Sequence, residues 1–168
     1  MSPTNNLFTL KAPGPLSELR SYITVANPSM SSIAVGTMAV WDTGSPLCFI
    51  SRKMMTALGL KFESEIAGHG IFGEGSTQYG KVAIRLVSKG RFFDVMAGVV
   101  ENLHRGEECQ ALIGMNLIGL GQLSLSFRAG ISTFSFAIPA ITSSDLVDTV
   151  VSNDISAEFD YYNFSDDT

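Results

Sequence analysis

The chain has 168 residues, about the length of one domain. Hydrophobic residues make up 45% and charged residues 16%, which is enough apolar material for one core and excludes disorder of the whole chain. Eleven basic and sixteen acidic residues give a net charge of −5, and the longest basic run is the pair Arg52 and Lys53. Because nucleic-acid binding needs a basic patch, we expect no nucleic-acid partner.

The charge is unevenly divided along the chain. Residues 141–168 contain seven acidic and no basic residues, whereas residues 1–140 contain nine acidic and eleven basic residues, a net charge of +2. A near-neutral body with an acidic appendage is typical of a folded domain followed by a tail. The sequence therefore predicts an irregular N-terminal arm (residues 1–20), one folded domain (residues 21–140) and an acidic, disordered tail (residues 141–168).

The cysteine content and the length of the apolar runs indicate the cellular compartment in which the protein would be found. Cys48 and Cys109 are too few for a disulfide framework, and two free thiols fit a reducing environment. The N-terminal segment lacks the features of a signal peptide, and no apolar run approaches the roughly 20 residues that span a bilayer. We expect a cytoplasmic protein without a membrane partner.

Short runs rich in Val, Ile, Phe and Thr, separated by Gly, Pro, Asn and Ser, predict strands through most of the chain. In chain order these are Tyr22–Ala26, Ile33–Trp41, Leu47–Ser51, Lys81–Val87, Phe92–Val100, Gln122–Phe127 and Thr133–Ile138. Two short helices are predicted, at Lys53–Leu58 and Met115–Ile118, each followed by glycine. Many short strands with two small helices predict an all-β barrel or sandwich.

Three segments stand out against this background. An apolar strand runs directly into the turn sequence Asp42-Thr43-Gly44-Ser45, which alone is a commonplace turn composition. About seventy residues later, a second apolar strand ends at Gly114 and opens a short helix. Between them, glycines at positions 68, 70, 73, 75 and 80 predict a flexible hairpin.

In order and spacing, these segments resemble the retropepsin-like aspartic proteases, with a pattern closer to the cellular and bacterial members than to the retroviral enzymes. The resemblance covers Tyr22 to Pro139 and includes the closing hairpin with its alternating strands. It implies an all-β, retropepsin-like acid protease barrel with one or two short helices, functional as a homodimer.

The resemblance also implies roles for individual residues. Asp42 would be the catalytic carboxylate. The active-site loop would be supported by Thr43, Gly44, Ser45 and Gly114. The flap that covers the substrate would contain Gly70, Ile71, Phe72 and Gly73.

The chain has one Asp-Thr-Gly sequence, whereas this chemistry needs two carboxylates about 3 Å apart that share a proton. The dyad would therefore come from two copies of Asp42 across a two-fold axis. This predicts an aspartic endopeptidase that activates water to hydrolyse a peptide or protein substrate, with no cofactor. No metal is expected, because the spacing around His104 matches no standard zinc pattern.

Two positions depart from the retroviral pattern. Pro46 stands where those enzymes have an aspartate that holds the substrate backbone, and Met115 stands where they have an arginine that braces the dimer. A catalytically silent retropepsin-fold module for dimerisation or peptide binding is therefore a second hypothesis, and an unrelated ligand-binding β-barrel a third. The dimer contact is expected to include the hairpin Gln122–Ile138 as well as the loops around Thr43, with one apolar face of the hairpin toward the barrel and the other toward a partner. A charged residue in place of Phe134 or Phe136 is expected to give monomer or insoluble protein.

Overall fold

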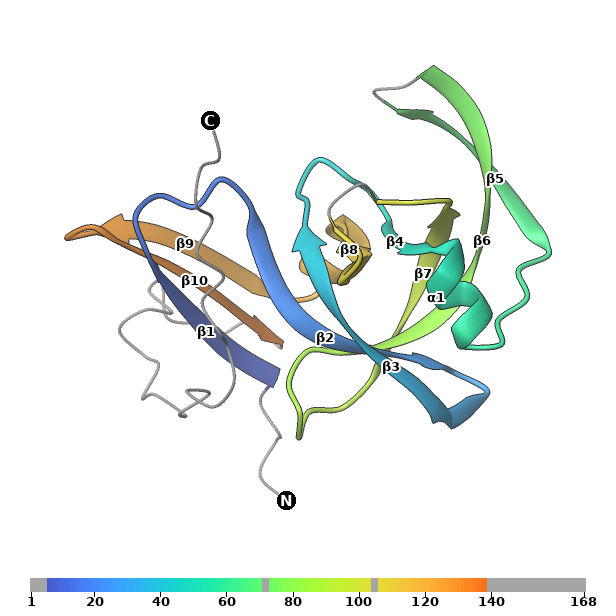
Figure 1. The fold of residues 1–168 in the computed structure, drawn as a ribbon, viewed down its shortest axis with the longest axis horizontal. Coiled ribbons are helices and arrows are strands. Elements are labelled where there is room, and N and C mark those ends of the chain that lie inside the picture. The colour runs from blue at the N-terminus through green and yellow to red at the C-terminus, as the bar shows by residue number, and fades with distance from the viewer. Residues whose placement is uncertain (1–5, 71–72, 104–105, 139–168) are drawn as a thin grey trace.

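The computed structural model describes residues 6–70, 73–103 and 106–138 (Figure 1). It contains two short helices, α1 (Arg52–Ala57) and α2 (Met115–Ile118). The strands are β1 (Asn6–Pro13), β2 (Leu19–Asn27), β3 (Met30–Trp41), β4 (Cys48–Ser51), β5 (Ser64–Gly70), β6 (Gly73–Arg85), β7 (Phe93–Val100), β8 (Cys109–Ile113), β9 (Gln122–Arg128) and β10 (Ile131–Ile138).

These strands form two sheets. The larger has the order β2-β3-β8-β4-β7-β6-β5, and an additional pairing of β2 with β6 closes six of its strands into a barrel. β5 pairs only with β6, so the β5–β6 hairpin projects from the barrel at the upper right of Figure 1. The smaller sheet is antiparallel and has the order β1-β10-β9.

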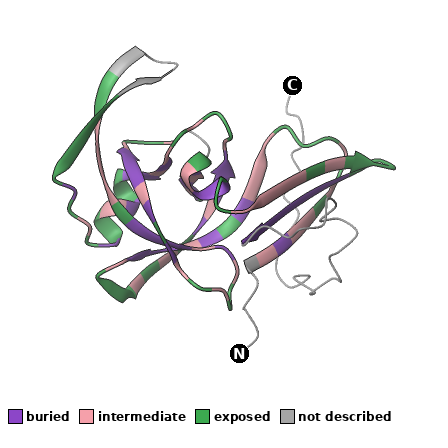
Figure 2. Cartoon of the chain, turned by 180° about the vertical axis from the view of Figure 1, so that it is seen from behind, coloured by how far each residue is buried: buried purple, intermediate pink, exposed green. Residues whose placement is uncertain are grey.

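An aromatic cluster joins the two sheets. Trp41, at the end of β3, packs against Phe8, Phe134 and Phe136 with ring centroids 4.8–5.6 Å apart. Its indole Nε1 donates a hydrogen bond of 2.8 Å to Ser21 Oγ on β2. All four aromatic side chains are buried. Figure 2 shows stretches of buried residues, in purple, along strands of both sheets. The cluster therefore fixes the end of β3 against both sheets.

The predicted all-β class is confirmed. Each predicted strand and both predicted helices overlap an observed element, and α2 has the predicted bounds. Residues 1–20, however, are not an irregular arm throughout: β1 pairs with β10 over its whole length, from Asn6 with Ile138 to Pro13 with Ile131. The sequence LFTLKA alternates weakly, and its partner strand is more than a hundred residues away. The predicted tail lies outside the described residues.

Two of the three phenylalanines in the closing hairpin lie inside the protomer. Phe134 and Phe136 are 1% and 0% exposed and face the core of their own chain. Ile131 is 45% exposed, and the most exposed apolar side chains of the hairpin are Leu125 and Phe127, at 54% and 57%. These two are cross-strand partners of Phe134 and Ser132, so they lie on the same face of the sheet but beyond the part that the barrel covers.

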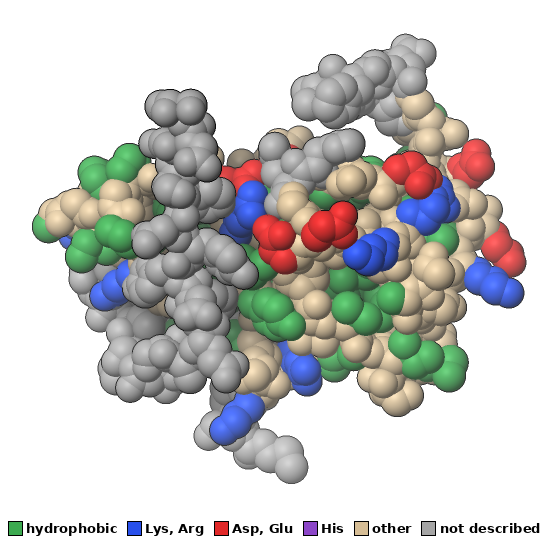
Figure 3. Space-filling view, viewed as in Figure 1, with side chains coloured by type: hydrophobic (Ala, Val, Ile, Leu, Met, Phe, Trp, Pro, Cys, Tyr) green, Lys and Arg blue, Asp and Glu red, His purple; other side chains and the backbone are tan. Residues whose placement is uncertain are grey.

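Charges on the surface are mixed in sign. Acidic and basic side chains lie interspersed on the face shown in Figure 3, with apolar side chains between them. Several form ion pairs at the surface, among them Arg20 with Glu18 and Lys53 with Glu107. In the part of the chain that the structure describes, no helix has the length and hydrophobicity to cross a membrane.

Candidate active site

The turn that contains Asp42 begins where β3 leaves the barrel. The Asp42 amide donates a hydrogen bond of 2.9 Å to the carbonyl of Ile113, the last residue of β8. β3 and β8 are parallel neighbours, with Trp41 opposite Ile113. Because parallel strands end at the same edge of a sheet, Asp42 and Gly114 emerge side by side. The topology thus brings together two segments that are seventy residues apart.

The carboxylate of Asp42 is held by its own turn. Its Oδ1 accepts a hydrogen bond of 2.8 Å from the Gly44 amide, and its carbonyl accepts one of 3.3 Å from the Ser45 amide. A Cβ on Gly44 would lie 3.1 Å from Oδ1, tighter than ordinary van der Waals contact. Thr43 and Gly44 are exposed and Asp42 is half-buried. The turn therefore presents an oriented carboxylate to the surface of the protomer.

The rest of the loop is fixed to the start of α2. Met115 N donates 2.8 Å to Ser45 O, and Asn116 N donates 3.1 Å to Pro46 O. Ser45 Oγ donates 2.7 Å to Leu47 O, which tightens the loop from within. These bonds satisfy backbone groups that a loop would otherwise have to expose to water.

Gly114 lies beneath this loop. A Cβ built on it would overlap the carbonyl of Leu47 and would come within 2.9 Å of Ser45 O. Both obstacles are backbone atoms, which cannot rotate away as a side chain can. The backbone of α2 can reach the loop only if this residue has no side chain.

Asn116 is a site residue to which the sequence analysis assigned no role. Its side chain accepts a hydrogen bond of 2.9 Å from Cys48 N on β4 and donates one of 2.7 Å to Met96 O on β7. The sequence offers one signal for it, its position two residues after Gly114. α2 is so short that an asparagine there is not needed for helix stability, so another role for the side chain could be suspected.

The predicted flap coincides with the end of the β5–β6 hairpin. Gly70 and Gly73 are opposite each other in the ladder, whereas Ile71 and Phe72 lie outside the described residues. In Figure 1 the far end of this hairpin and the loop that follows β3 both lie at the top of the view.

Cys48 lies directly behind the loop and is fully buried. Burial raises the pKa of its thiol from 9.0 to about 11, and a hydrogen bond from Gly114 N to Sγ, 3.4 Å long, opposes this only in part. Burial also raises the pKa of the Cys109 thiol. Both thiols are therefore neutral at physiological pH, and Cys48 acts as a small apolar residue that packs beneath the site.

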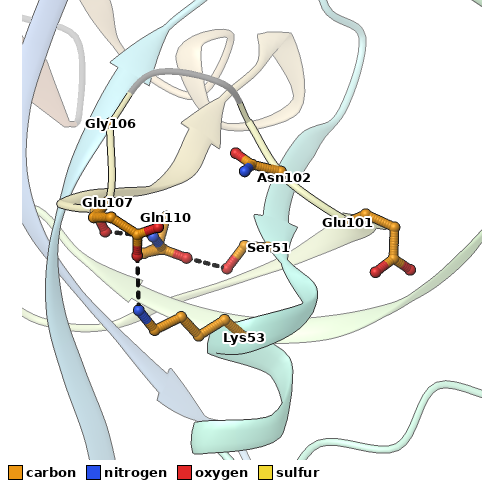
Figure 4. Close-up of a pocket in the computed structure, with 7 residues that line it drawn as sticks. All are labelled: Ser51, Lys53, Glu101, Asn102, Gly106, Glu107 and Gln110. Carbon is orange, nitrogen blue, oxygen red and sulfur yellow. Dashed lines mark hydrogen bonds and ion pairs between the residues drawn. The ribbon is translucent and has the colours of Figure 1, made fainter.

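A polar hollow of about 260 Å³ lies elsewhere on the surface (Figure 4). Within it, Lys53 Nζ is 2.9 Å from a carboxylate oxygen of Glu107, and Gln110 is hydrogen-bonded to Ser51 Oγ and to Glu107 O. Its lining includes none of the predicted site residues. Among the described residues, no group of three or more His, Cys, Asp or Glu side chains could hold a metal ion; His104 is not among them.

Comparisons with known proteins agree with this geometry. Residues 34–117, half of the chain, match a model of the aspartyl protease family. The chain belongs to this family. The matched segment begins in β3 and ends in α2, so it includes Asp42, the hairpin and Gly114. A comparison with curated proteins gives no match.

One solved structure shows the predicted retropepsin-like fold. A retropepsin-like aspartic protease from Rickettsia conorii is 12% identical, with a TM-score of 0.50, and the match covers 82% of this chain and 98% of that one. EIAV protease is 14% identical with a TM-score of 0.43, covering 61% of this chain and 86% of the other. The retroviral protease-like domain of Ddi1 from Leishmania major is 14% identical with a TM-score of 0.41, covering 71% and 95%. At 12% identity, the likeness to the Rickettsia conorii protease concerns the fold alone.

Proposed function

We propose that this aspartyl protease family member is an endopeptidase whose active site is completed by a second copy of the chain. Each protomer would contribute one Asp42, and the two carboxylates would share a single proton. The observation that carries the proposal is the turn itself, in which Gly44 N orients the Asp42 carboxylate at an exposed loop fixed to α2.

The chemistry follows from the shared proton. The ionised carboxylate would take a proton from a bound water, whose oxygen attacks the carbonyl carbon of the scissile peptide bond. The protonated carboxyl would stabilise the developing oxyanion and then help to protonate the leaving amine. Thr43, Gly44, Ser45 and Gly114 would hold the loop in place during this exchange.

The substrate would be an extended, mainly hydrophobic peptide segment that lies between the dyad and the hairpin. The glycines at the end of the hairpin, Gly70 and Gly73 among them, would let it open and close over the peptide. The two buried, unpaired cysteines fit a reducing compartment, and we place the activity in the cytoplasm.

A homodimer is a chemical requirement of this mechanism, since a lone protomer has half of the dyad. Two exposed apolar side chains, Leu125 and Phe127, supply a surface that a second copy could cover. Pro46, in the loop, and Met115, at the start of α2, are also exposed. Backbone hydrogen bonds from Met115 N to Ser45 O and from Asn116 N to Pro46 O connect α2 to the loop. The dimer would thus bury apolar side chains near the dyad instead of forming an ion pair there.

Substitution of Asp42 by Asn tests the proposal. We expect cleavage of an unstructured protein substrate between pH 3 and 7 to fall at least a thousandfold, while the fold and the dimer persist. Asp94→Asn, which alters an exposed carboxylate on β7, is the matched control and should cleave as the wild type does. An active Asp42→Asn variant would exclude the carboxylate mechanism. A wild-type dimer that binds peptides without cleaving them would favour the catalytically silent module.

A further inference from the structure

The amide of Asn116 joins three elements that meet under the active-site loop. The residue lies on α2, its Oδ1 accepts from Cys48 N on β4, and its Nδ2 donates to Met96 O on β7, at 2.9 and 2.7 Å. Its own backbone N–H donates to Pro46 O in the loop that carries Asp42. One side chain thus bonds both to the strand that follows the catalytic loop and to a strand of the barrel wall.

The bond to β7 leads to the hairpin. Met96 lies directly opposite Lys81 on β6, and the next residue of β7, Ala97, pairs with Gly80 on β6 and with Cys48 on β4. β6 continues without a break from this point to Gly73, at the far end of the hairpin. Asn116 therefore bonds to the strand on which the base of the hairpin rests.

An asparagine side chain is suited to this position by its chemistry. It offers an acceptor and a donor on one rigid planar group, so it can bond to an N–H and to a carbonyl at once. A carboxylate could accept from Cys48 N but would place a negative oxygen against Met96 O. A protonated carboxyl group, by contrast, can both donate and accept, and it has nearly the shape of the amide.

We propose that Asn116 is a positioning residue that couples the Asp42 loop to the hairpin, so that loosening one loosens the other. The inference rests on the proposed protease function for its effect on catalysis, but the coupling itself is a property of the fold. Asn116 does not touch the reacting groups; it acts through β4, β7 and the loop.

Asn116→Asp in the full chain tests the coupling by amide hydrogen exchange between pH 3.5 and 7.5. Exchange is expressed relative to the wild type at each pH, in residues 43–50 and residues 73–81; the last residues of β6 are left out because they pair with β2. At the lowest pH the new carboxyl is protonated and both ratios should be near 1. As it ionises, both should rise together by about tenfold or more. The ratio of kcat/KM to wild type should fall over the same pH range.

Asn27→Asp is the matched control, because Asn27 has the same bonding pattern away from the site: Nδ2 donates to Leu58 O at 3.1 Å and Oδ1 accepts from Ser29 N at 3.0 Å. It should raise exchange near residues 27–29 and leave both site segments unchanged. Asn116→Ser, which removes both bonds without adding a charge, should raise exchange in both segments at every pH.

The outcomes separate this inference from the proposed function. Exchange that rises in residues 43–50 alone, or equally in the Asn27→Asp control, would overturn the coupling. If the wild type cleaves no substrate, the protease proposal fails while the exchange ratios still decide the role of Asn116. Coupled exchange with an unchanged kcat/KM profile would also overturn the proposed role in positioning the catalytic loop.

Discussion

Two hairpins of this protein, β5–β6 and β9–β10, are built in opposite ways. In β5 of the first, all the side chains described, residues 64–67, are exposed, and the strand pairs only with β6. In β10 of the second, every residue from Ser132 to Ile138 is buried, and the strand lies between two others. The turn of the second is set by Ala129 and Gly130, both with positive φ, as in the two-residue turns that match strand twist.

This difference indicates what stabilises each hairpin. The first depends on its hydrogen-bond ladder, whereas the second is part of the aromatic core around Trp41. A segment with few buried contacts can open at little cost, but a segment within the core opens only with the whole domain. The first hairpin therefore suits a moving cover, and the second suits a rigid platform for another protomer.

The largest effect is expected from breaking the second hairpin at its core. Phe134→Ala removes a fully buried ring that packs edge-on against Trp41 at 5.3 Å. It should lower the free energy of unfolding by about 3–5 kcal/mol. Phe127→Ala, in the same hairpin but 57% exposed, should change it by less than about 0.5 kcal/mol in dilute protein. Urea unfolding of both variants measures the contrast, and equal losses would contradict it.

A pair of glycine substitutions separates the fixed loop from the exposed hairpin. Gly114→Ala would place a methyl group against the backbone of Leu47 and should cost about 1–3 kcal/mol, with a large loss of activity. Gly75→Ala on β6 meets nothing within 4 Å and should leave stability nearly unchanged. Thermal unfolding and kcat/KM of both variants test this. A well-tolerated alanine at Gly114 would show that the loop can shift to admit a side chain.

A smaller effect is expected on assembly. The double variant Leu125→Ser, Phe127→Ser should raise the dimer dissociation constant about tenfold, a change of about 1.4 kcal/mol, without altering monomer stability. Met30→Ser, at an equally exposed position in the β2–β3 turn region, is the control and should have no effect. Sedimentation over a dilution series measures the constant. An unchanged constant in the double variant would place the dimer contact elsewhere.

Local sequence predicted the elements well where local chemistry decides them. Neighbouring residues are enough to predict the alternation in β9 and β10, the end of each helix near a glycine, and the Asp-Thr-Gly turn. β1 was not, because its partner is β10 at the other end of the chain and its own alternation is weak. The sequence alone also does not decide that Phe134 points inward. Alternation shows that a strand has two faces but does not show which face the barrel covers.

The candidate site also contains residues that the sequence singles out and one, Asn116, whose role depends on distant strands. Asp42 and Gly114 stand out in the sequence through the order and spacing of their segments, and the parallel pairing of β3 with β8 brings them together. Asn116 could not be assigned a role, because its partners, Cys48 and Met96, are brought to it only when β4 and β7 pair in parallel. Side chains that act through non-local backbone bonds leave little trace in a single sequence.

The smallest expected effect concerns the thiol behind the loop. Burial raises the pKa of Cys48 from 9.0 in the unfolded chain to about 11, so the unfolded state loses its proton first as the pH rises. The stabilisation is therefore fully present below pH 9 and should decline by about 1 kcal/mol by pH 10. Cys48→Ala should remove this part of the pH dependence, although it lowers stability at every pH. Urea unfolding at pH 7, 9 and 10 gives the difference between the two proteins. A difference that stays constant over this range would mean that water reaches Sγ and that the loop is less tightly packed on β4 than its hydrogen bonds indicate.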